Sequence, residues 1–255
     1  MTFWEHLDEL RTCLIHILIA TMVCSIAAFF LREPIFSLIM APYHSDFITF
    51  RIINQLFTHN NLNEFVASDL TLINTGIANQ FLVHLRVSVY VGLLCVSPYI
   101  LYILFGFISP ALYSQERKIA IRTTISGYLL FMLGMAVNYF IIFPFSVLFL
   151  GSYQVSGEVT NMIDLNSYIS MFLLLSLTLG IMFELPVVCA MLGRLGIVDA
   201  GLLRTYRRHV AVAILIISAF ITPTGDPFTL LLVALPIYIL YEVSILVVKR
   251  QKTTA

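Results

Sequence analysis

The sequence predicts an all-α membrane protein whose six transmembrane helices are kinked and form a concave bundle, with both termini in the cytoplasm. Hydrophobic residues fill 60% of the 255 positions and charged residues only 11%, whereas a soluble domain is about 45–50% apolar. The apolar residues occur in long runs, and the basic residues collect on one side of those runs. We therefore expect a single polytopic membrane domain over residues 1–255.

One helical crossing of a bilayer needs about 20 mostly apolar residues. None of the apolar runs shows the alternating polar face of a membrane barrel strand, so helices are predicted. The candidate spans are 12–31, 87–108, 123–147, 169–193, 209–222 and 228–248. The first span follows a polar, acidic N-terminus and has no small-residue cleavage site after it, so we expect it to remain in the membrane.

Residues 32–80 form the longest connection and are predicted to lie outside the cytoplasm. Their apolar clusters indicate short helices at the membrane interface, and the stretch HNNLN is typical of a turn. The connection TPTGDP between the last two spans is so short that they must form a tight antiparallel hairpin, which could fall short of crossing the whole bilayer. Prolines within the spans favour kinks; they are Pro98, Pro144, Pro186 and Pro236.

The orientation follows from the charges, because short cytoplasmic loops are enriched in Lys and Arg. Three arginines, Arg32, Arg51 and Arg86, lie on or near the outer side. The residues on the inner side are Arg11, Arg117, Lys118, Arg122, Arg194, Arg204, Arg207, Arg208, Lys249, Arg250 and Lys252. This asymmetry predicts that both termini are cytoplasmic.

Carboxylates are the main candidates for function. Glu9 lies in FWEHLDELR, which suits an amphipathic helix at the inner interface, and Glu116 lies in the cytoplasmic stretch FGFISPALYSQERK. Either could be part of a solvated charged surface or a receptor for a cation. Glu184 interrupts an apolar span, where a carboxylate is costly and usually faces a partner, a cavity or a proton.

Other polar residues have simpler interpretations. A lone membrane histidine such as His84 more often makes a helix-to-helix hydrogen bond than binds a ligand. The cluster RTYRRH at 204–209 is interpreted as topogenic and lipid-facing rather than as a substrate site. Glu242 is expected to reach the interface, and Asp226 is either a turn or N-cap residue or a functional one. The cysteines, Cys13, Cys24, Cys95 and Cys189, have no metal or redox spacing.

Four blocks of the chain resemble the TatC family, the signal-peptide receptor of the twin-arginine protein translocase. HLDELR, FISPALYSQERK, FELP and TPTGDPFTLLLVALPIYILYE stand here in the family's order and spacing. The resemblance covers essentially the whole chain. The stretch SDFITFRIINQLFTHNNLNEF, within 44–68, looks like an insertion, and Leu230 stands where a glutamine is common.

The resemblance implies a set of site residues. Glu9 and Glu116 would bind the paired arginines of an export signal, with Leu10 and Arg11 beside the first. Phe107, Pro110 and Tyr113 would shape the second. The remaining matches are an intramembrane group for partner contact, Glu184, Pro186 and Asp226, and two positions of the outer side, Pro42 and Tyr168.

The resemblance also implies a function. The protein would recognise twin-arginine signals on folded precursors in the bacterial cytoplasmic (inner) membrane. With small single-span subunits of the TatA and TatB type, and as a homo-oligomer, it would nucleate a translocation complex driven by the proton-motive force. Membrane lipids are expected contacts and nucleic acid is not. We expect no cofactor, no metal and no catalytic residue, because no enzyme motif is present.

Three alternatives remain open at this level. Glu184 could lock adjacent helices, form a polar patch for a partner's membrane helix, or carry a proton. The last possibility fits a proton-coupled transporter of small solutes, although such proteins often show repeated broken helices that are not evident here. A purely structural scaffold would leave both cytoplasmic carboxylates without a role in capturing a signal.

Overall fold

The computed structural model describes residues 3–44, 46–59, 71–108, 117–156 and 161–254. Within these ranges the side chains of several residues near the gaps and the chain ends, Glu9 and Phe107 among them, are not described. The chain divides into two compact units, unit 1 with residues 1–35 and 81–129 and unit 2 with residues 36–80 and 130–255. The single domain, the concave bundle and the orientation of the termini stay predictions.

Five long apolar segments are able to cross a membrane in the described part of the chain. They are Leu10–Phe30, Asn79–Phe105, Thr123–Ser152, Leu165–Arg194 and Pro227–Val248. The predicted span 209–222 corresponds to helix α10, Arg207–Ile221, which has 15 residues. At 1.5 Å per residue such a helix is about 22 Å long, and the hydrocarbon core is about 30 Å thick. Of the six predicted spans, five are thus long enough to cross, and the fifth, α10, falls short of the bilayer as the short hairpin connection indicated.

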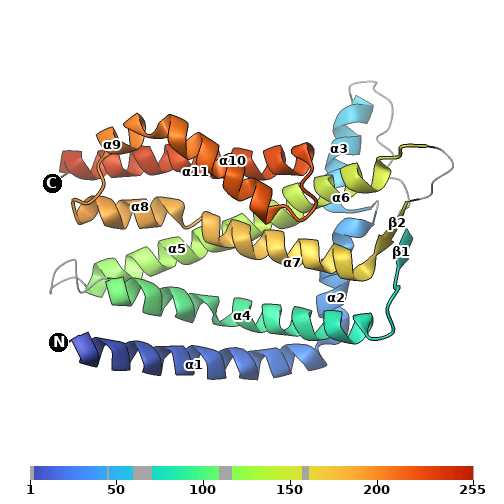
Figure 1. Cartoon of the computed structure of the whole chain (residues 1–255), viewed down its shortest axis with the longest axis horizontal. Helices are drawn as coiled ribbons and strands as arrows, with labels where there is room; N and C mark the ends of the chain where they lie inside the picture. Colours follow the sequence, from blue (N-terminus) through green and yellow to red (C-terminus); the bar gives the residue numbers. More distant parts are fainter. Residues whose placement is uncertain (1–2, 45, 60–70, 109–116, 157–160, 255) are drawn as a thin grey trace. The chain divides into compact units, whose positions relative to one another are not determined.

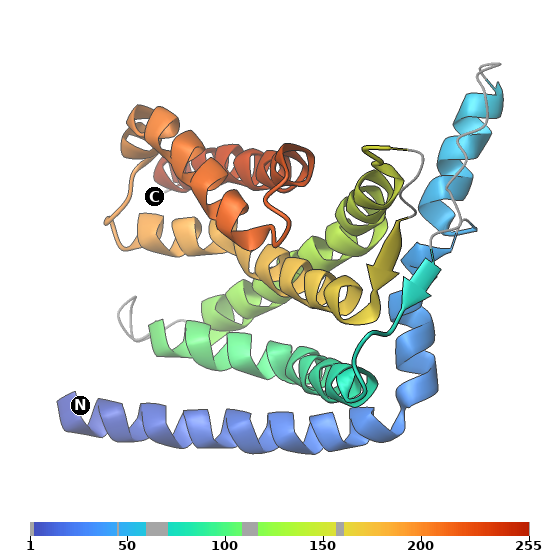
Figure 2. The ribbon, with the colours of Figure 1, turned by 45° about the vertical axis from the view of Figure 1, so that its right-hand side comes forward.

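Unit 1 contains α1 (Phe3–Phe30), most of α4 (Asn79–Ile108) and the first part of α5 (Arg117–Val137). Helices α1 and α4 run antiparallel, side by side (Figures 1 and 2). They approach closely at Gly92, where an added Cβ would lie 2.7 Å from the backbone nitrogen of Ser25. His84 Nε2 lies 3.0 Å from the carbonyl oxygen of Phe29, which confirms the predicted helix-to-helix hydrogen bond.

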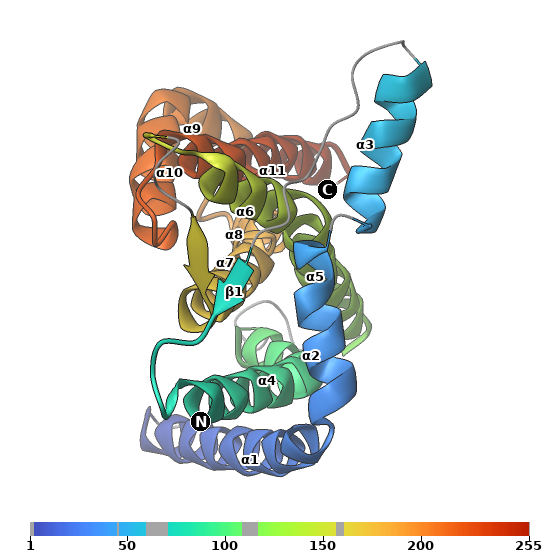
Figure 3. The ribbon, with the colours of Figure 1, turned by 90° about the vertical axis from the view of Figure 1, so that its right-hand side faces the viewer.

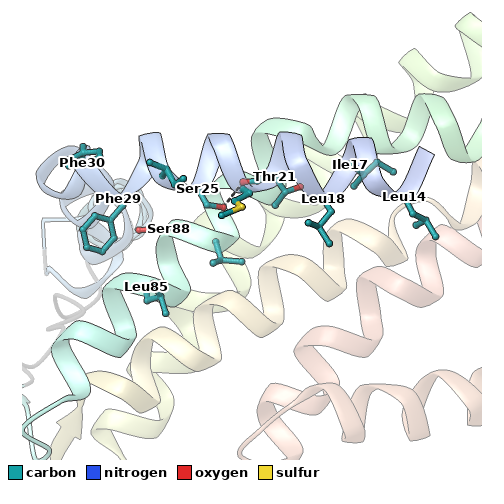
Figure 4. Close-up of a pocket in the computed structure, with 12 residues that line it drawn as sticks. Leu14, Ile17, Leu18, Thr21, Ser25, Phe29, Phe30, Leu85 and Ser88 are labelled. Atoms are coloured by element: carbon teal, nitrogen blue, oxygen red, sulfur yellow. Dashed lines mark hydrogen bonds between the residues drawn. The ribbon is translucent and has the colours of Figure 1, made fainter. Parts of the chain in front are cut away.

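A groove of about 810 Å³ runs beside the contact between α1 and α4. Figure 4 shows side chains of α1 from Leu14 to Phe30 along it, with Leu85 and Ser88 of α4 near one end. Almost all of its walls are apolar side chains. In a membrane protein such a surface faces lipid or another membrane helix, because neither exposes polar groups to the hydrocarbon.

Unit 2 includes most of the long connection that follows the first span. The expected short helices are present: α2 (Arg32–Met40), the 3-10 helix η1 (Ala41–Tyr43) and α3 (Ile48–His59). Their location at the outer membrane interface stays a prediction. The chain then forms strand β1 (Thr71–Ile73), which pairs in parallel with β2 (Met162–Asp164), Leu72 opposite Ile163 (Figure 3). This pairing was not predicted. Most of HNNLN lies outside the described residues.

The third span contains an unusual segment. After α5 the chain takes π-helical geometry over η3 (Asn138–Ile142) and then continues as α6 (Phe143–Ser152), so the helical run extends beyond the predicted end at residue 147. Pro144 lies in the first turn of α6. A proline has no N–H to donate, and the π-helical segment lies immediately before it, where the N–H of Phe143 bonds to the carbonyl oxygen of Asn138.

The remaining long elements of unit 2 in the described residues are helices. The predicted span 169–193 is two helices, α7 (Leu165–Met182) and α8 (Leu185–Arg194), separated at Phe183 and Glu184. Then follow the short α9 (Ala200–Thr205), α10 and the long α11 (Pro227–Thr254), which packs against α8 and α10. Pro98 and Pro236 lie inside helices, whereas Pro144 and Pro186 lie at helix starts.

Candidate functional site

Neither of the two carboxylates predicted to bind the export signal has a described side chain. Glu9 is a residue of α1 whose side chain is not described, and Glu116 lies in the undescribed residues 109–116, together with Pro110 and Tyr113. The side chain of Phe107 is also outside the described part. The geometry of this group therefore stays a prediction.

The helix ends nearest to these positions in sequence are described, and they belong to unit 1. Helix α1 begins at Phe3, α4 ends at Ile108 and α5 begins at Arg117, and all three ends lie at the same end of unit 1 (Figures 1 and 2). On α1, Leu10 is half-buried and Arg11 is exposed. The start of α1 thus lies at the same end of unit 1 as the end of α4 and the start of α5, which are about a hundred residues later in the sequence.

Glu184 is fully described. It lies at the junction between α7 and α8, where its backbone carbonyl accepts hydrogen bonds from the N–H groups of Val187 and Val188. Only 8% of the residue is exposed, and neither carboxylate oxygen has a hydrogen-bond partner within the described residues. A buried carboxylate without partners costs free energy. A lock made by hydrogen bonds to an adjacent helix is not seen in this part of the chain.

The helix break beside Glu184 has a local cause. Pro186 has no N–H, so it cannot donate to the carbonyl one turn earlier, and α7 ends at Met182. Just before the break, α7 packs tightly against α5. A Cβ on Gly134 would lie 2.7 Å from the carbonyl oxygen of Leu179 and 2.8 Å from the ring of Phe183. Glu184 therefore directly follows a closely packed helix crossing.

A second buried polar pair in unit 2 was missed by the sequence reasoning. Asn138 is fully buried and its Nδ2 donates a hydrogen bond of 2.7 Å to the hydroxyl oxygen of Ser176 on α7. The other polar atom of the amide, Oδ1, has no partner within the described residues. An asparagine inside the apolar run GMAVNYFIIF was the available signal. The π-helical segment begins at this residue, and such segments often occur where a helix serves a function.

The structure brings Tyr168 and Pro42 to one place in unit 2. The Tyr168 hydroxyl donates to the carbonyl oxygen of Ile39 at 3.1 Å, next to the buried Pro42 of η1. The hydroxyl of Tyr139 similarly donates to the carbonyl oxygen of Leu38 at 2.8 Å. The last carbonyls of a helix have no partner in the helix itself, so the two tyrosines satisfy the end of α2 and hold it to the membrane helices.

Asp226 caps a helix. Its Oδ1 accepts the backbone N–H of Thr229 in the first turn of α11 at 2.7 Å, and its Oδ2 accepts the hydroxyl of Thr224. Burial works to raise the pKa of Asp226, but the hydrogen bonds from Thr224 and Thr229 outweigh it and leave the pKa below its ordinary value. The N-cap interpretation from sequence is confirmed, and contact with a partner stays a prediction.

No group of three or more His, Cys, Asp or Glu residues suited to a metal is found within the described ranges.

Comparisons with known proteins show the family to which the chain belongs. The family description "Sec-independent protein translocase protein (TatC)" matches residues 5–236. A TatC protein from Blattabacterium sp. subsp. Periplaneta americana is 34% identical over 250 residues, 96% of this chain and 94% of that protein. The chain belongs to the TatC family.

Further TatC proteins agree. TatCy of Bacillus subtilis is 33% identical over 98% of this chain and 89% of its own length, and TatC of Escherichia coli K12 is 32% identical over 94% and 85%. A crystal structure described as the twin arginine translocase receptor TatC has a TM-score of 0.76 and 31% identity, and covers 96% of this chain and 98% of its own. The chain is therefore a multi-pass membrane protein of the twin-arginine export pathway in bacterial membranes, a transport protein rather than an enzyme.

Proposed function

We propose that this chain is the receptor subunit of a twin-arginine translocase, and that Glu9 and Glu116 together bind the paired arginines of the export signal. Leu10 and Arg11 would flank the first carboxylate, and Phe107, Pro110 and Tyr113 would shape the surroundings of the second. The observation that carries the proposal is the TatC membership over nearly the full chain, with a solved relative described as the receptor. The common location of the α1, α4 and α5 ends in unit 1 supports it.

The chemistry fits two carboxylates. Arginine presents a planar fork of N–H donors that a carboxylate accepts bidentately, and lysine cannot reproduce this geometry. A hydrogen bond to a charged group contributes about 1.5–3 kcal/mol. Two such sites, one for each arginine, favour a pair of arginines over a pair of lysines, and burial of the signal's apolar stretch would add affinity.

The orientation and the partners belong to the same proposal. The Lys and Arg asymmetry supports cytoplasmic termini, so that Glu9 and Glu116 would face the compartment in which precursors fold. Single-span subunits of the TatA and TatB type would contact the buried Glu184, since a carboxylate without a partner of its own can accept hydrogen bonds from another membrane helix. Several copies would assemble, and the proton-motive force would drive transport. Family membership favours this function over transport of small solutes.

The test is the affinity of the purified protein for a peptide carrying Arg-Arg, measured for Glu9→Gln, Glu116→Gln and the double variant. Each single change is expected to weaken binding by about ten- to a hundredfold, because it removes one charge-assisted contact. The double variant should bind barely at all.

Asp8→Asn is the matched control, since Asp8 is an exposed residue of the same helix turn and the change in charge is the same. It should bind the peptide as the wild type does. Wild-type affinity in the double variant, or an equal loss in the control, would refute the assignment of these two residues.

A further inference from the structure

The segment of unit 2 that covers α9 and the start of α10 carries a basic cluster, which we define as Arg204, Arg208 and His209. All three side chains are exposed. The segment 194–209 that contains them has four arginines and one aspartate. The opposite end of the same hairpin, the turn TPTGDP, has no basic residue and one acid, Asp226. Positive charge is thus concentrated at one end of a membrane hairpin.

Exposed apolar side chains border the basic cluster. They form an apolar rim of Ile197, Leu202 and Tyr206, which are 63%, 47% and 50% exposed. Basic residues interleaved with exposed aliphatic and aromatic ones are the pattern of a segment that lies in the membrane interface. A tyrosine at this level, with its ring beside His209 at 5.6 Å between centroids, is also typical of the headgroup region.

The protein holds this segment in place from the other side. Leu203 of α9 is buried, and its carbonyl oxygen accepts the hydroxyl of Tyr241 on α11 at 2.6 Å. Asp199 caps α9 by accepting the N–H of Leu202. Arg207 pairs with Glu242 of α11 at 2.6 Å. These contacts fix the backbone from α9 to the start of α10, while the side chains of the basic cluster and the apolar rim remain exposed.

The acidic groups near the basic cluster are already engaged. Glu242 is paired with Arg207 and accepts the Tyr238 hydroxyl at 3.4 Å, and Asp199 serves as an N-cap. Neither therefore neutralises Arg204 or Arg208 through a contact that the described residues show. Guanidinium groups in this state can donate bidentate hydrogen bonds to phosphate oxygens.

We propose that the basic cluster and the apolar rim form a binding surface for anionic phospholipids, with the phosphate held by Arg204 and Arg208 and the rim inserted at headgroup depth. Phosphate and hydrocarbon are offered together by a lipid, which matches the two kinds of side chain that are exposed here. The surface does not depend on signal recognition. Only its leaflet, the cytoplasmic one, rests on the proposed orientation.

The test is native mass spectrometry of the purified full chain, titrated with dioleoyl-phosphatidylglycerol or with dioleoyl-phosphatidylcholine. The wild type is expected to retain the anionic lipid preferentially. Arg204→Gln/Arg208→Gln should lower phosphatidylglycerol binding by about fivefold for each arginine removed. Arg204→Lys/Arg208→Lys keeps the charge and should retain most of the binding.

Arg32→Gln/Arg51→Gln is the matched control, because it removes two exposed arginines elsewhere on the chain. It should leave phosphatidylglycerol binding unchanged. Equal binding of both lipids by the wild type, an unchanged Arg204→Gln/Arg208→Gln variant, or an equal loss in the control would each overturn the proposal. Circular dichroism of the variants should match the wild type, and peptide binding at Glu9 and Glu116 should persist, which separates this test from that of the proposed function.

Discussion

Glu184 is buried at the α7–α8 junction with no hydrogen-bond partner for its carboxylate within the described residues. Its position could be anticipated from sequence, since one acid in an apolar run stands out. Its lack of a partner could not, because that depends on which side chains of distant helices reach it. Asn138 does have a partner, but that partner, Ser176, is 38 residues away in sequence, and nothing in the local sequence predicts the pair.

Replacing Glu184 by methionine, which has a similar volume, should not destabilise the protein in detergent. The unpaired oxygens disappear, so the free energy of unfolding is expected to stay level or to rise by about 1 kcal/mol. Crosslinking to a single-span partner helix should fall at the same time. Ile181→Met, at an exposed position one turn earlier, is the control for both readouts. A loss of about 3 kcal/mol or more would indicate that Glu184 has a buried partner, contrary to the structure.

Asp226 gives a prediction about pH. A carboxylate whose pKa is lowered by folding stabilises the folded state above its unfolded pKa of about 3.9, and this contribution is lost as the pH falls through the folded pKa. Asp226→Ala should cost about 0.5–2 kcal/mol of unfolding free energy at pH 7 through loss of the α11 N-cap.

The difference between wild type and Asp226→Ala, measured by denaturant unfolding in detergent, should be constant between pH 8 and 5 and shrink below about pH 4. Asp226→Asn is the control, since asparagine is an equally good N-cap. Its difference from Ala should not change with pH. A wild-type difference that grows in acid would contradict the hydrogen bonds assigned to Asp226.

At the scale of elements, the apolar runs predicted where five long membrane segments lie. They did not predict the break at 183–184, the π-helical segment Asn138–Ile142 or the pairing of β1 with β2. Hydropathy describes how a side chain partitions between water and lipid, and it does not describe which hydrogen bonds the backbone makes. Pro186 marked the break, but the strands are some ninety residues apart and only the folded chain brings them together.

The end of α2 offers a test of how the outer connection is held. Tyr168→Phe removes the hydroxyl that donates to the carbonyl of Ile39 and leaves that buried acceptor unpaired. The expected cost is about 1–3 kcal/mol. Hydrogen exchange of the amides from Phe36 to Tyr43 should accelerate more than exchange elsewhere in unit 2.

Tyr153→Phe removes a hydroxyl from a tyrosine that is 65% exposed, and it serves as the control. It should leave exchange and stability unchanged. If Tyr168→Phe exchanged at the wild-type rate, the tyrosine contact would not be what fixes the end of α2.

The contact between α1 and α4 in unit 1 depends on a glycine. A Cβ at Gly92 would meet backbone atoms of α1, the nitrogen of Ser25 and the carbonyl oxygen of Thr21, which cannot rotate away. Gly92→Ala should therefore cost about 1–3 kcal/mol of unfolding free energy, in the range of overpacked interiors. Thermal unfolding in detergent followed by circular dichroism measures this. An unchanged or raised midpoint would mean that the two helices are farther apart than described.

For the whole molecule, the sequence was sufficient to predict the membrane class and, through four motif blocks, the family that the comparisons confirm. The short connection TPTGDP also indicated that the last hairpin could fall short of the bilayer, in agreement with the 15 residues of α10. The sequence could not show the geometry around Glu9 and Glu116, which depends on side chains brought together by the fold.

Whether Glu9 and Glu116 bind paired arginines is tested by site-specific photocrosslinking from positions 9 and 116 to a signal peptide carrying Arg-Arg and to the same peptide carrying Lys-Lys. We expect labelling from both positions by the Arg-Arg peptide and much weaker labelling by the Lys-Lys peptide, since only arginine matches a carboxylate bidentately. Equal labelling by the two peptides, or labelling from only one of the two positions, would contradict it.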